Sequence, residues 1–306
     1  MPDGPTVTTE QLTGPPMALG RPADAGPSPT RQLVRRMRRV RMAPTGAMLV
    51  AFFVVLALAA GLLSPRDPLA QDLGSVVQAP SWAHPFGTDN LGRDVLSRAI
   101  HGSRISLEVG LIANALALVI GVPLGLIAGF SRTALDHVVM RVLDGILAFP
   151  ALVLAVAIAA VLGPSLWTVI IAITVTSVPY IARLARGETL SVREQEYVLA
   201  AVSLGAPQGH IINRHVLPNI LAPIIVQSSL NISFAMLAEA ALSFLGVGIQ
   251  PPAPSWGSML QAGYRYVEIA PWLVLAPGAA IFLAVLGFNF VSDGLRETLD
   301  PRLRQL

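Results

Sequence analysis

Long apolar runs separated by polar or charged segments make up most of the sequence. Six of these runs are candidates for membrane spans, because about 20 apolar residues cover a hydrocarbon core of about 30 Å. They are residues 45–63, 105–130, 142–162, 166–181, 220–247 and 271–290. Pro150 is expected to kink the third span. The pattern predicts an all-α membrane protein with six transmembrane helices.

The placement of arginine orients these spans. Residues 31–41 contain six Arg, whereas residues 64–104 balance four Arg with four Asp. Because basic segments stay in the cytoplasm, we expect both termini of a six-span chain to be cytoplasmic. The Arg run could also bind anionic membrane lipids. A cleaved signal peptide ending near Ala59 is the alternative, and the long Pro- and Gly-rich tail over residues 1–30, expected to be disordered, disfavours it.

Composition narrows the chemistry that the chain can perform. It is 53% hydrophobic and 13% charged, as expected for a polytopic membrane protein. There is no Cys, which excludes disulfides and zinc–thiolate sites. All 21 basic residues are Arg, and a Walker A loop requires a Lys on the phosphates. The chain is therefore not expected to bind ATP by that route, so any ATP-driven motion has to come from a partner.

The polar insert over residues 183–218 has the pattern of two short helices joined by a turn. Residues 194–204 contain no Gly or Pro and repeat apolar positions at helical spacing. Gly205 is expected to end this helix in the left-handed conformation. Pro207 can begin a second helix, and residues 217–218 are expected to end the unit. The pattern predicts a two-helix projection on the cytoplasmic face.

Within this insert, Ala200-Ala201, Gly205 and the run from His215 to Pro218 match the spacing of the EAA loop, so the chain resembles bacterial ABC import permeases. In that family the loop forms a coupling helix that docks into a groove on the ATPase subunit. Leu199 stands where the family has its Glu, and His215 where Ile is frequent. These departures are typical of the dipeptide and oligopeptide subgroup. The resemblance assigns ATPase coupling to Glu196, Ala200, Ala201, Gly205, His215, Leu217 and Pro218.

Two external strings carry a second, independent resemblance. Residues 87–94 and 251–257 are similar to segments of the C-type permease of peptide and nickel ABC importers. Between residues 91 and 99, apolar side chains fall on one side of a helical projection, while Asp94 and Arg98 are spaced to pair on the other. This pattern predicts an interfacial helix on the outer leaflet. Trp256 is expected to lie at the membrane interface.

A small and polar stripe runs along the fifth span, formed by Ser228, Asn231, Ala235, Glu239 and Ser243. An anionic Glu239 at the bilayer centre would cost about 2.5–3.5 kcal/mol, so it should face protein or an aqueous cavity. Two interpretations stay open. Glu239 and Asn231 line a translocation path, or Glu239 is protonated or hydrogen-bonded and holds this helix against a partner subunit.

Two further patterns predict helix contacts. Gly110, Asn114, Gly121 and Gly125 fall near one stripe of the second span, which favours close helix packing. Asp144 lies one turn after Arg141, so a local ion pair between them is expected rather than a proton relay.

The resemblance, which covers about residues 50–302, implies a type I ABC importer permease fold with a cytoplasmic coupling helix. The expected divisions are 1–44, a basic tail; 45–104, the first span and an external loop; 105–292, a five-helix core with the coupling loop 183–218; and 293–306, a second tail. The implied partners are a second permease, one or two ATPase subunits that bind ATP and Mg, and an external substrate-binding protein. No nucleic-acid partner, metal, cofactor or catalytic residue is expected on this chain itself.

The function that the resemblance implies is alternating-access import of peptides across a bacterial cytoplasmic membrane. An ion-coupled secondary transporter is the alternative; it would need intramembrane ionisable groups, of which Glu239 is the clear example. An intramembrane serine protease would need Ser and His in one embedded site. The His residues fall in loops or at span edges, which disfavours this third possibility.

Overall fold

The computed structural model describes residues 42–131 and 134–299, and within these ranges the chain is helical without a β-strand. Residues 1–41 of the predicted tail 1–44, and the final residues 300–306, lie outside the described ranges. In the described part of the chain, four helical runs are long and apolar enough to span a membrane: α4 (Val95–Phe130), α7 (Leu166–Arg193), Gln208–Phe244 with α10 (Leu217–Phe244) as its main part, and α12 (Trp272–Leu299).

The remaining two predicted spans are built differently. α5 (Ala134–Leu147) and α6 (Ala151–Leu162) pass the same test only as a pair, bent by 86° at the break between them. Pro150 precedes α6 as its N-cap residue, so the predicted kink is a complete break. α2 (Ala43–Leu58) is a shorter apolar helix of 16 residues and is followed by α3 (Ala60–Leu63). All six predicted spans are therefore helical, and the all-α membrane architecture is confirmed.

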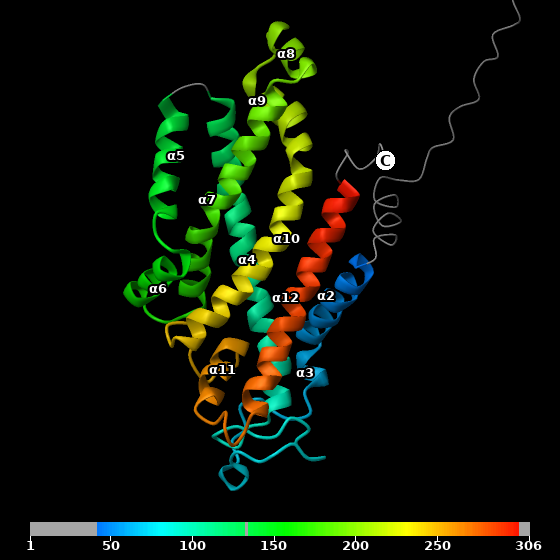
Figure 1. The fold of residues 1–306 in the computed structure, drawn as a ribbon, viewed down its shortest axis with the longest axis vertical. Helices are drawn as coiled ribbons and strands as arrows, with labels where there is room; N and C mark the ends of the chain where they lie inside the picture. The colour runs from blue at the N-terminus through cyan, green and yellow to red at the C-terminus, as the bar shows by residue number, and fades with distance from the viewer. Residues whose placement is uncertain (1–41, 132–133, 300–306) are drawn as a thin grey trace, which may run out of the picture.

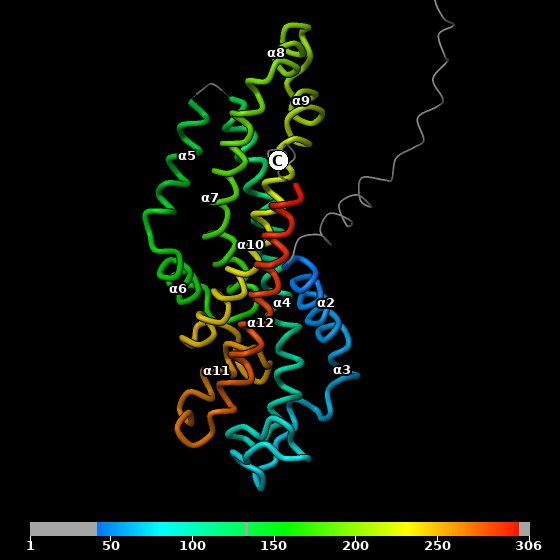
Figure 2. The backbone as a smooth tube through the Cα atoms, turned by 45° about the vertical axis from the view of Figure 1, so that its right-hand side comes forward, coloured from blue at the N-terminus to red at the C-terminus, as the bar shows by residue number. Residues whose placement is uncertain are grey.

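The helices form an elongated bundle with two distinct ends (Figure 1). α8 (Glu196–Ser203) and α9 (Gln208–Ile211) project from one end, which we call the handle end. The segment 64–94, with the short 3-10 helix η2 (Leu73–Ser75), lies at the opposite end together with α11 (Trp256–Tyr264), and we call this the loop end. α5 and α6 run along one side of the bundle and α2 and α3 along the other, in both Figure 1 and Figure 2.

Glycines allow α4 and α7 to pack at close range. A Cβ added at Gly125 would clash with the Ala182 carbonyl oxygen, and one at Gly121 would lie 2.9 Å from the Ile181 Cβ. These contacts leave no room for a side chain, because real Cβ atoms do not approach other atoms so closely. Gly110 faces Met236 of α10 in the same way, at 2.9 Å. The predicted glycine stripe thus forms the seams that join α4 to α7 and α10.

The predicted interfacial helix before residue 105 is wrong. Asp94 instead caps one continuous helix, α4, by accepting a hydrogen bond from the Ser97 N–H at 2.8 Å. Its other oxygen lies 2.9 Å from Nδ1 of His84. Arg98 does not pair with Asp94 but with Asp89, at 3.4 Å. The reason is that an Asp at a helix start satisfies free backbone N–H groups and becomes the N-cap.

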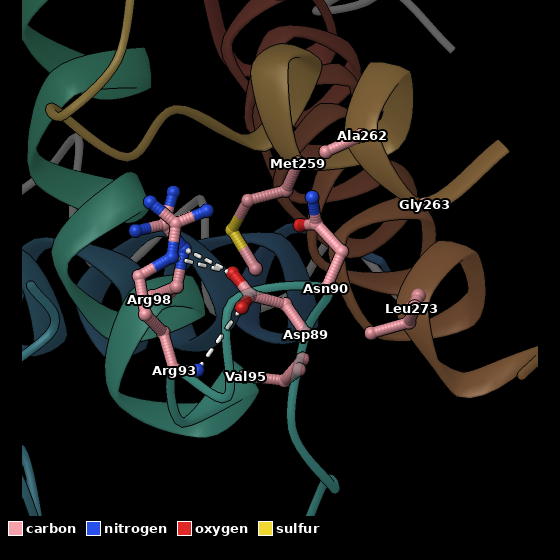
Figure 3. A pocket seen from close by; sticks show the side chains of 9 residues that line it. All are labelled: Asp89, Asn90, Arg93, Val95, Arg98, Met259, Ala262, Gly263 and Leu273. Carbon is pink, nitrogen blue, oxygen red and sulfur yellow. Dashed lines mark hydrogen bonds and ion pairs between the residues drawn. The ribbon is translucent and has the colours of Figure 1, made fainter. Parts of the chain in front are cut away.

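The buried ion cluster at the loop end is shown in Figure 3. The carboxylate of Asp89 points toward both Arg93 and Arg98, with a distance of 2.7 Å to Nε of Arg93. Arg98 also donates from Nη1 to the Pro68 carbonyl oxygen at 3.1 Å. These contacts tie the segment 64–94 to the first turn of α4. Outside the spans, the Ser75 hydroxyl, together with the Gly74 N–H, donates to Asp72 and holds the pKa of that carboxyl below its usual value.

Two other predicted contacts differ from the structure. Trp256 is fully buried rather than placed at the membrane interface, and its Nε1–H donates to the Ala99 carbonyl oxygen at 2.9 Å. It is buried because α11 folds back against α10 and α12, which places this ring in the core beside Phe53. Asp144 pairs at 2.5 Å with Arg183 of α7 and not with the neighbouring Arg141. The contact between α5 and α7 supplies a partner from a distant part of the sequence.

Candidate functional site

The handle comprises residues 196–211. Its first helix, the turn at Gly205 and the start of its second helix form as the sequence predicts. α8 ends at Ser203 with Leu204 as its C-cap residue, and Gly205 adopts a positive φ of 75°. The Gly205 N–H donates to the Val202 carbonyl oxygen and the Ala206 N–H to that of Ala201. This pair of hydrogen bonds is the Schellman motif, which requires a left-handed residue at the position of Gly205. The predicted left-handed turn is confirmed.

A small apolar core fixes the handle to the bundle. Val198 of α8 and Ile211 of α9 are buried together with Val216, Leu126 of α4 and Ala185 of α7. Other apolar side chains lie outside this core and are exposed. They are Tyr197, Leu199 and Val202 of α8 and the C-cap residue Leu204, which is 87% exposed. The handle projects at the tip of the molecule (Figure 1), is packed against the bundle through this core, and carries exposed apolar side chains.

The junction between the handle and α10 differs from the prediction. Residues 217–218 do not end the unit, because the helix continues from Gln208 to Phe244. A π-helical turn, Ile212–Val216, precedes α10, and Pro218 occupies the first turn of α10. Proline is tolerated there because a first turn needs no N–H donor. The handle is thus continuous with a membrane-spanning helix.

The seven predicted coupling residues all lie on the handle or at this junction. The His215 ring lies beside two other rings, with its centroid 6.2 Å from that of Tyr197 and 6.0 Å from that of His210, the latter in an edge-on arrangement. Glu196, Ala200, Gly205 and Pro218 are exposed, and Ala201, His215 and Leu217 are half-buried. The prediction did not include the exposed apolar residues Tyr197, Val202 and Leu204. Their apolar character at solvent-facing positions of a polar insert was the available signal.

A cavity of about 450 Å³ lies between α6, α7 and α10, toward the middle of the bundle. Among the described residues, its polar lining consists of amide and hydroxyl groups, and no Asp, Glu, Arg, Lys or His faces it. The lining residues are Ala151, Leu152, Ala155, Ile173, Thr176, Ser177, Tyr180, Gln227, Asn231, Phe234, Ala235, Leu237, Ala238 and Ala241. These amides and hydroxyls can both donate and accept hydrogen bonds, so this wall suits a polar small molecule, and the ionic partners of any charged groups on that molecule have to come from outside this wall.

Asn231 joins the cavity wall to α4. Its Nδ2 donates to Oδ1 of Asn114 at 3.0 Å, and Nδ2 of Asn114 donates to the Ser228 hydroxyl at 2.7 Å. Among the predicted path residues, Asn231 is the one that lines the cavity.

Glu239 is placed differently from Asn231. It is 0% exposed and accepts hydrogen bonds from the hydroxyls of Ser106 at 3.0 Å and Ser243 at 2.9 Å. Ser106 belongs to α4, so Glu239 connects α10 to α4 of the same chain. It does not line the cavity in this structure, and the helix that it contacts is not part of a partner subunit. Within residues 42–131 and 134–299, no group of three or more His, Cys, Asp or Glu could hold a metal ion.

The sequence and the fold place this chain among the membrane subunits of binding-protein-dependent transporters. The family described as "Binding-protein-dependent transport system inner membrane component" matches residues 121–305, and the "N-terminal TM domain of oligopeptide transport permease C" matches residues 28–80. The first match spans more than half of the chain, so the chain belongs to this family of ABC permease subunits.

Individual relatives agree with this assignment. The chain is 44% identical to a dipeptide transport system permease protein of Alkalihalophilus pseudofirmus, covering 90% of this chain and 91% of that protein. It is 43% identical to a di/tripeptide permease of Pseudomonas aeruginosa, covering 91% and 94%, and 40% identical to a glutathione permease of Pectobacterium atrosepticum, covering 90% and 92%.

A solved structure supports the fold. The inward-facing MetNI methionine ABC transporter matches with a TM-score of 0.56, covering 66% of this chain and 96% of that chain at 19% identity. The type I importer permease fold expected from the sequence is confirmed.

Proposed function

We propose that this chain is the C-type permease of an ATP-driven importer that moves peptides across a bacterial cytoplasmic membrane by alternating access. The exposed apolar face of the handle carries the proposal. Exposed apolar patches rimmed by polar residues mark protein interaction sites, and the handle end lies opposite the loop end where cargo would arrive. With both termini in the cytoplasm, the handle faces partner ATPases, where ATP and Mg bind and hydrolysis takes place.

Peptides are the cargo that fits both the relatives and the cavity. The three relatives named above transport dipeptides, di- and tripeptides, and glutathione according to their names, and all of these contain peptide bonds. The side-chain amides of Gln227 and Asn231 and the hydroxyls of Thr176, Ser177 and Tyr180 can exchange hydrogen bonds with peptide groups. We infer that the cavity is part of the translocation path and that a second permease completes it.

In this scheme Asn231 and Glu239 have separate roles. Asn231 meets the cargo, whereas Glu239 positions α10 against α4 through Ser106. ATP binding brings the two ATPases together, the handles move with them, and the helices that surround the cavity rearrange. An external substrate-binding protein delivers cargo to the loop end. The ion-coupled alternative has no support, because no Asp, Glu, Arg, Lys or His of the described chain faces the cavity.

Reconstitution tests this function. The chain, its partner permease, the ATPases and the binding protein are placed in liposomes, and uptake of a labelled dipeptide is measured. Uptake is expected only when ATP and all subunits are present. Uptake driven by an ion gradient through this polypeptide alone would overturn the proposal.

A further inference from the structure

Two helices link the handle to the cavity: α10, which continues from α9, and α7. The last turn of α7 leads into α8, while residues nearer its start, from Ile173 to Tyr180, line the cavity. A movement of the handle therefore acts on α7 directly. The third wall of the cavity, α6, is not directly continuous with the handle and is connected to it along the chain only through α7 or α5.

α4 is fixed to α7 and is expected to move with it. In addition to the seam at Gly121 and Gly125, a Cβ at Gly129 would lie 2.7 Å from the Thr189 Cβ. Arg193, the last residue of α7, donates from Nη1 to the Gly129 carbonyl oxygen at 2.7 Å. The final carbonyl groups of a helix lack intrahelical partners and carry partial negative charge, so an arginine stabilises them. No relative motion between these two helices is expected.

α5 is joined to α7 by a different kind of contact. Arg186 donates from Nε and Nη2 to the two carboxylate oxygens of Asp136, both at 2.7 Å. The Asp136 side chain is only 15% exposed, so this bidentate pair is partly shielded from water. Arg183 pairs with Asp144 one turn nearer the cavity, and there both side chains are about half exposed. Asp136 and Asp144 are eight residues apart, which places the two pairs about 12 Å apart along α5.

Apolar packing of α5 is comparatively weak. Leu143 is its one fully buried residue, with Val139, Met140 and Ile146 partly buried in the same cluster, while Leu135, Val138 and Val142 are exposed. Two ion pairs at separate points resist both sliding and rotation of a rod, which a single patch of apolar packing around Leu143 resists less. The ion pairs therefore determine whether α5 follows α7.

α6 transmits any rotation of α5 to the cavity. The two helices are bent by 86° at the break before Ala151, and the first residues of α6, Ala151, Leu152 and Ala155, line the cavity. Because the bend places α6 across the direction of α5, turning α5 about its axis swings α6 toward or away from α10.

We propose that Arg186 and Arg183 of α7, through Asp136 and Asp144 of α5, transmit the movement of the handle to the α6 wall of the cavity. These four are positioning residues: they do not touch cargo, and they make α5 and α6 follow α7 during the transport cycle. The inference rests on the function proposed above and adds the route by which handle motion reaches the cavity. The Arg186–Asp136 pair carries most of the effect, since the other pair is exposed and screened.

The test measures peptide imported per ATP hydrolysed by the complete reconstituted complex. Arg186→Gln is expected to lower this ratio roughly tenfold, the size expected for losing a bidentate hydrogen bond between charged groups. Arg183→Gln should give a smaller loss. The matched control is Arg141→Gln, because Arg141 is an exposed arginine of α5 without an ion-pair partner among the described residues. It should leave the ratio unchanged.

A charge exchange separates transmission from simple destabilisation. The double variant Arg186→Asp with Asp136→Arg should recover most of the ratio, and Asp136→Asn should reproduce the loss if Arg186→Gln assembles poorly. A distance measurement adds a direct readout: since the chain has no Cys, nitroxide labels can be placed on Val153 of α6 and Leu275 of α12, both exposed and outside the cavity lining. ATP should change this distance, and Arg186→Gln should abolish the change.

The outcomes are distinct. If the unmodified complex imports peptide with ATP while Arg186→Gln keeps both the import ratio and the ATP-dependent distance change, the transmission route is wrong and the proposed function stands. The transmission route is also wrong if the double variant Arg186→Asp with Asp136→Arg imports no more peptide per ATP than Arg186→Gln does. If the unmodified complex itself fails to import peptide with ATP, the proposed function fails and this inference with it.

Discussion

Replacing Gly205 by valine tests whether the shape of the handle transmits force. At φ 75°, an ordinary L residue costs about 1–2 kcal/mol, and a β-branched residue lies at the upper end of this range. No described atom lies within 4 Å of a Cβ added there. The cost is therefore backbone strain alone, about 2 kcal/mol, which lowers the population of the native turn by up to about 30-fold.

Gly209 supplies a matched control two residues into α9. A Cβ there would also meet open space, but Gly209 has no positive φ. Gly209→Val should therefore be close to neutral, since valine has a slightly better helix propensity than glycine. Gly205→Asn should fall between the two, because asparagine tolerates the left-handed region.

The assay is uptake of labelled dipeptide and ATP hydrolysis by the same liposomes. We expect Gly205→Val to keep hydrolysis and to lower uptake per ATP, by a few-fold up to the limit of about 30-fold set by the strain. If Gly205→Val and Gly209→Val give the same uptake per ATP, the turn at Gly205 has no role in coupling, and the proposed role of the handle shape is refuted.

Three further changes test the packing of the spans. Glu239→Gln keeps the shape and one acceptor oxygen, so uptake should persist; loss of uptake with normal assembly would instead favour a charged Glu239 in the path. Gly125→Val should cost about 3 kcal/mol or more through contact with the Ala182 carbonyl and lower the melting temperature of the complex, whereas Gly145→Val, in open space on α5, should not. Trp256→Ala should cost about 3–5 kcal/mol by leaving a core cavity, measured as thermal unfolding in detergent; an unchanged melting temperature would contradict its burial.

Local chemistry makes the spans and the handle predictable. An apolar run of suitable length specifies a membrane helix without reference to the rest of the chain. Gly205 followed by Pro207 specifies a helix end and a new start, because both residues act through their own backbone. The glycine stripe on α4 can also be predicted from the sequence, since its residues share one helix face whichever helices pack against that face.

Contacts between distant segments are not predictable in this way. Asp144 pairs with Arg183, 39 residues away, although Arg141 is available one turn earlier. Trp256 donates to the Ala99 carbonyl oxygen across 157 residues and is buried, although a Pro-rich external turn suggests a surface position. In each case the partner comes from helix packing, which the periodicity of one segment does not encode.

The junctions between spans give a mixed result. The spacing of Asp94 and Arg98 predicts an ion pair on a separate helix, whereas the position of Asp94 directly before a helical run indicates an N-cap and a continuous α4. Pro218 is expected to end the handle, yet proline in a first turn is compatible with a helix that continues. In both places the residue type is informative, and the competing rule for helix starts decides the structure.

Cross-linking from the handle tests the central claim most directly. In this Cys-free chain, a photoreactive group attached to Leu204→Cys, at the exposed tip of the handle, should link to an ATPase subunit in the assembled complex. The same group at Trp82→Cys, fully exposed in the segment at the loop end, should not. A Leu204→Cys product with the binding protein, or labelling of this cysteine by a membrane-impermeant thiol reagent added outside intact cells, would contradict the account.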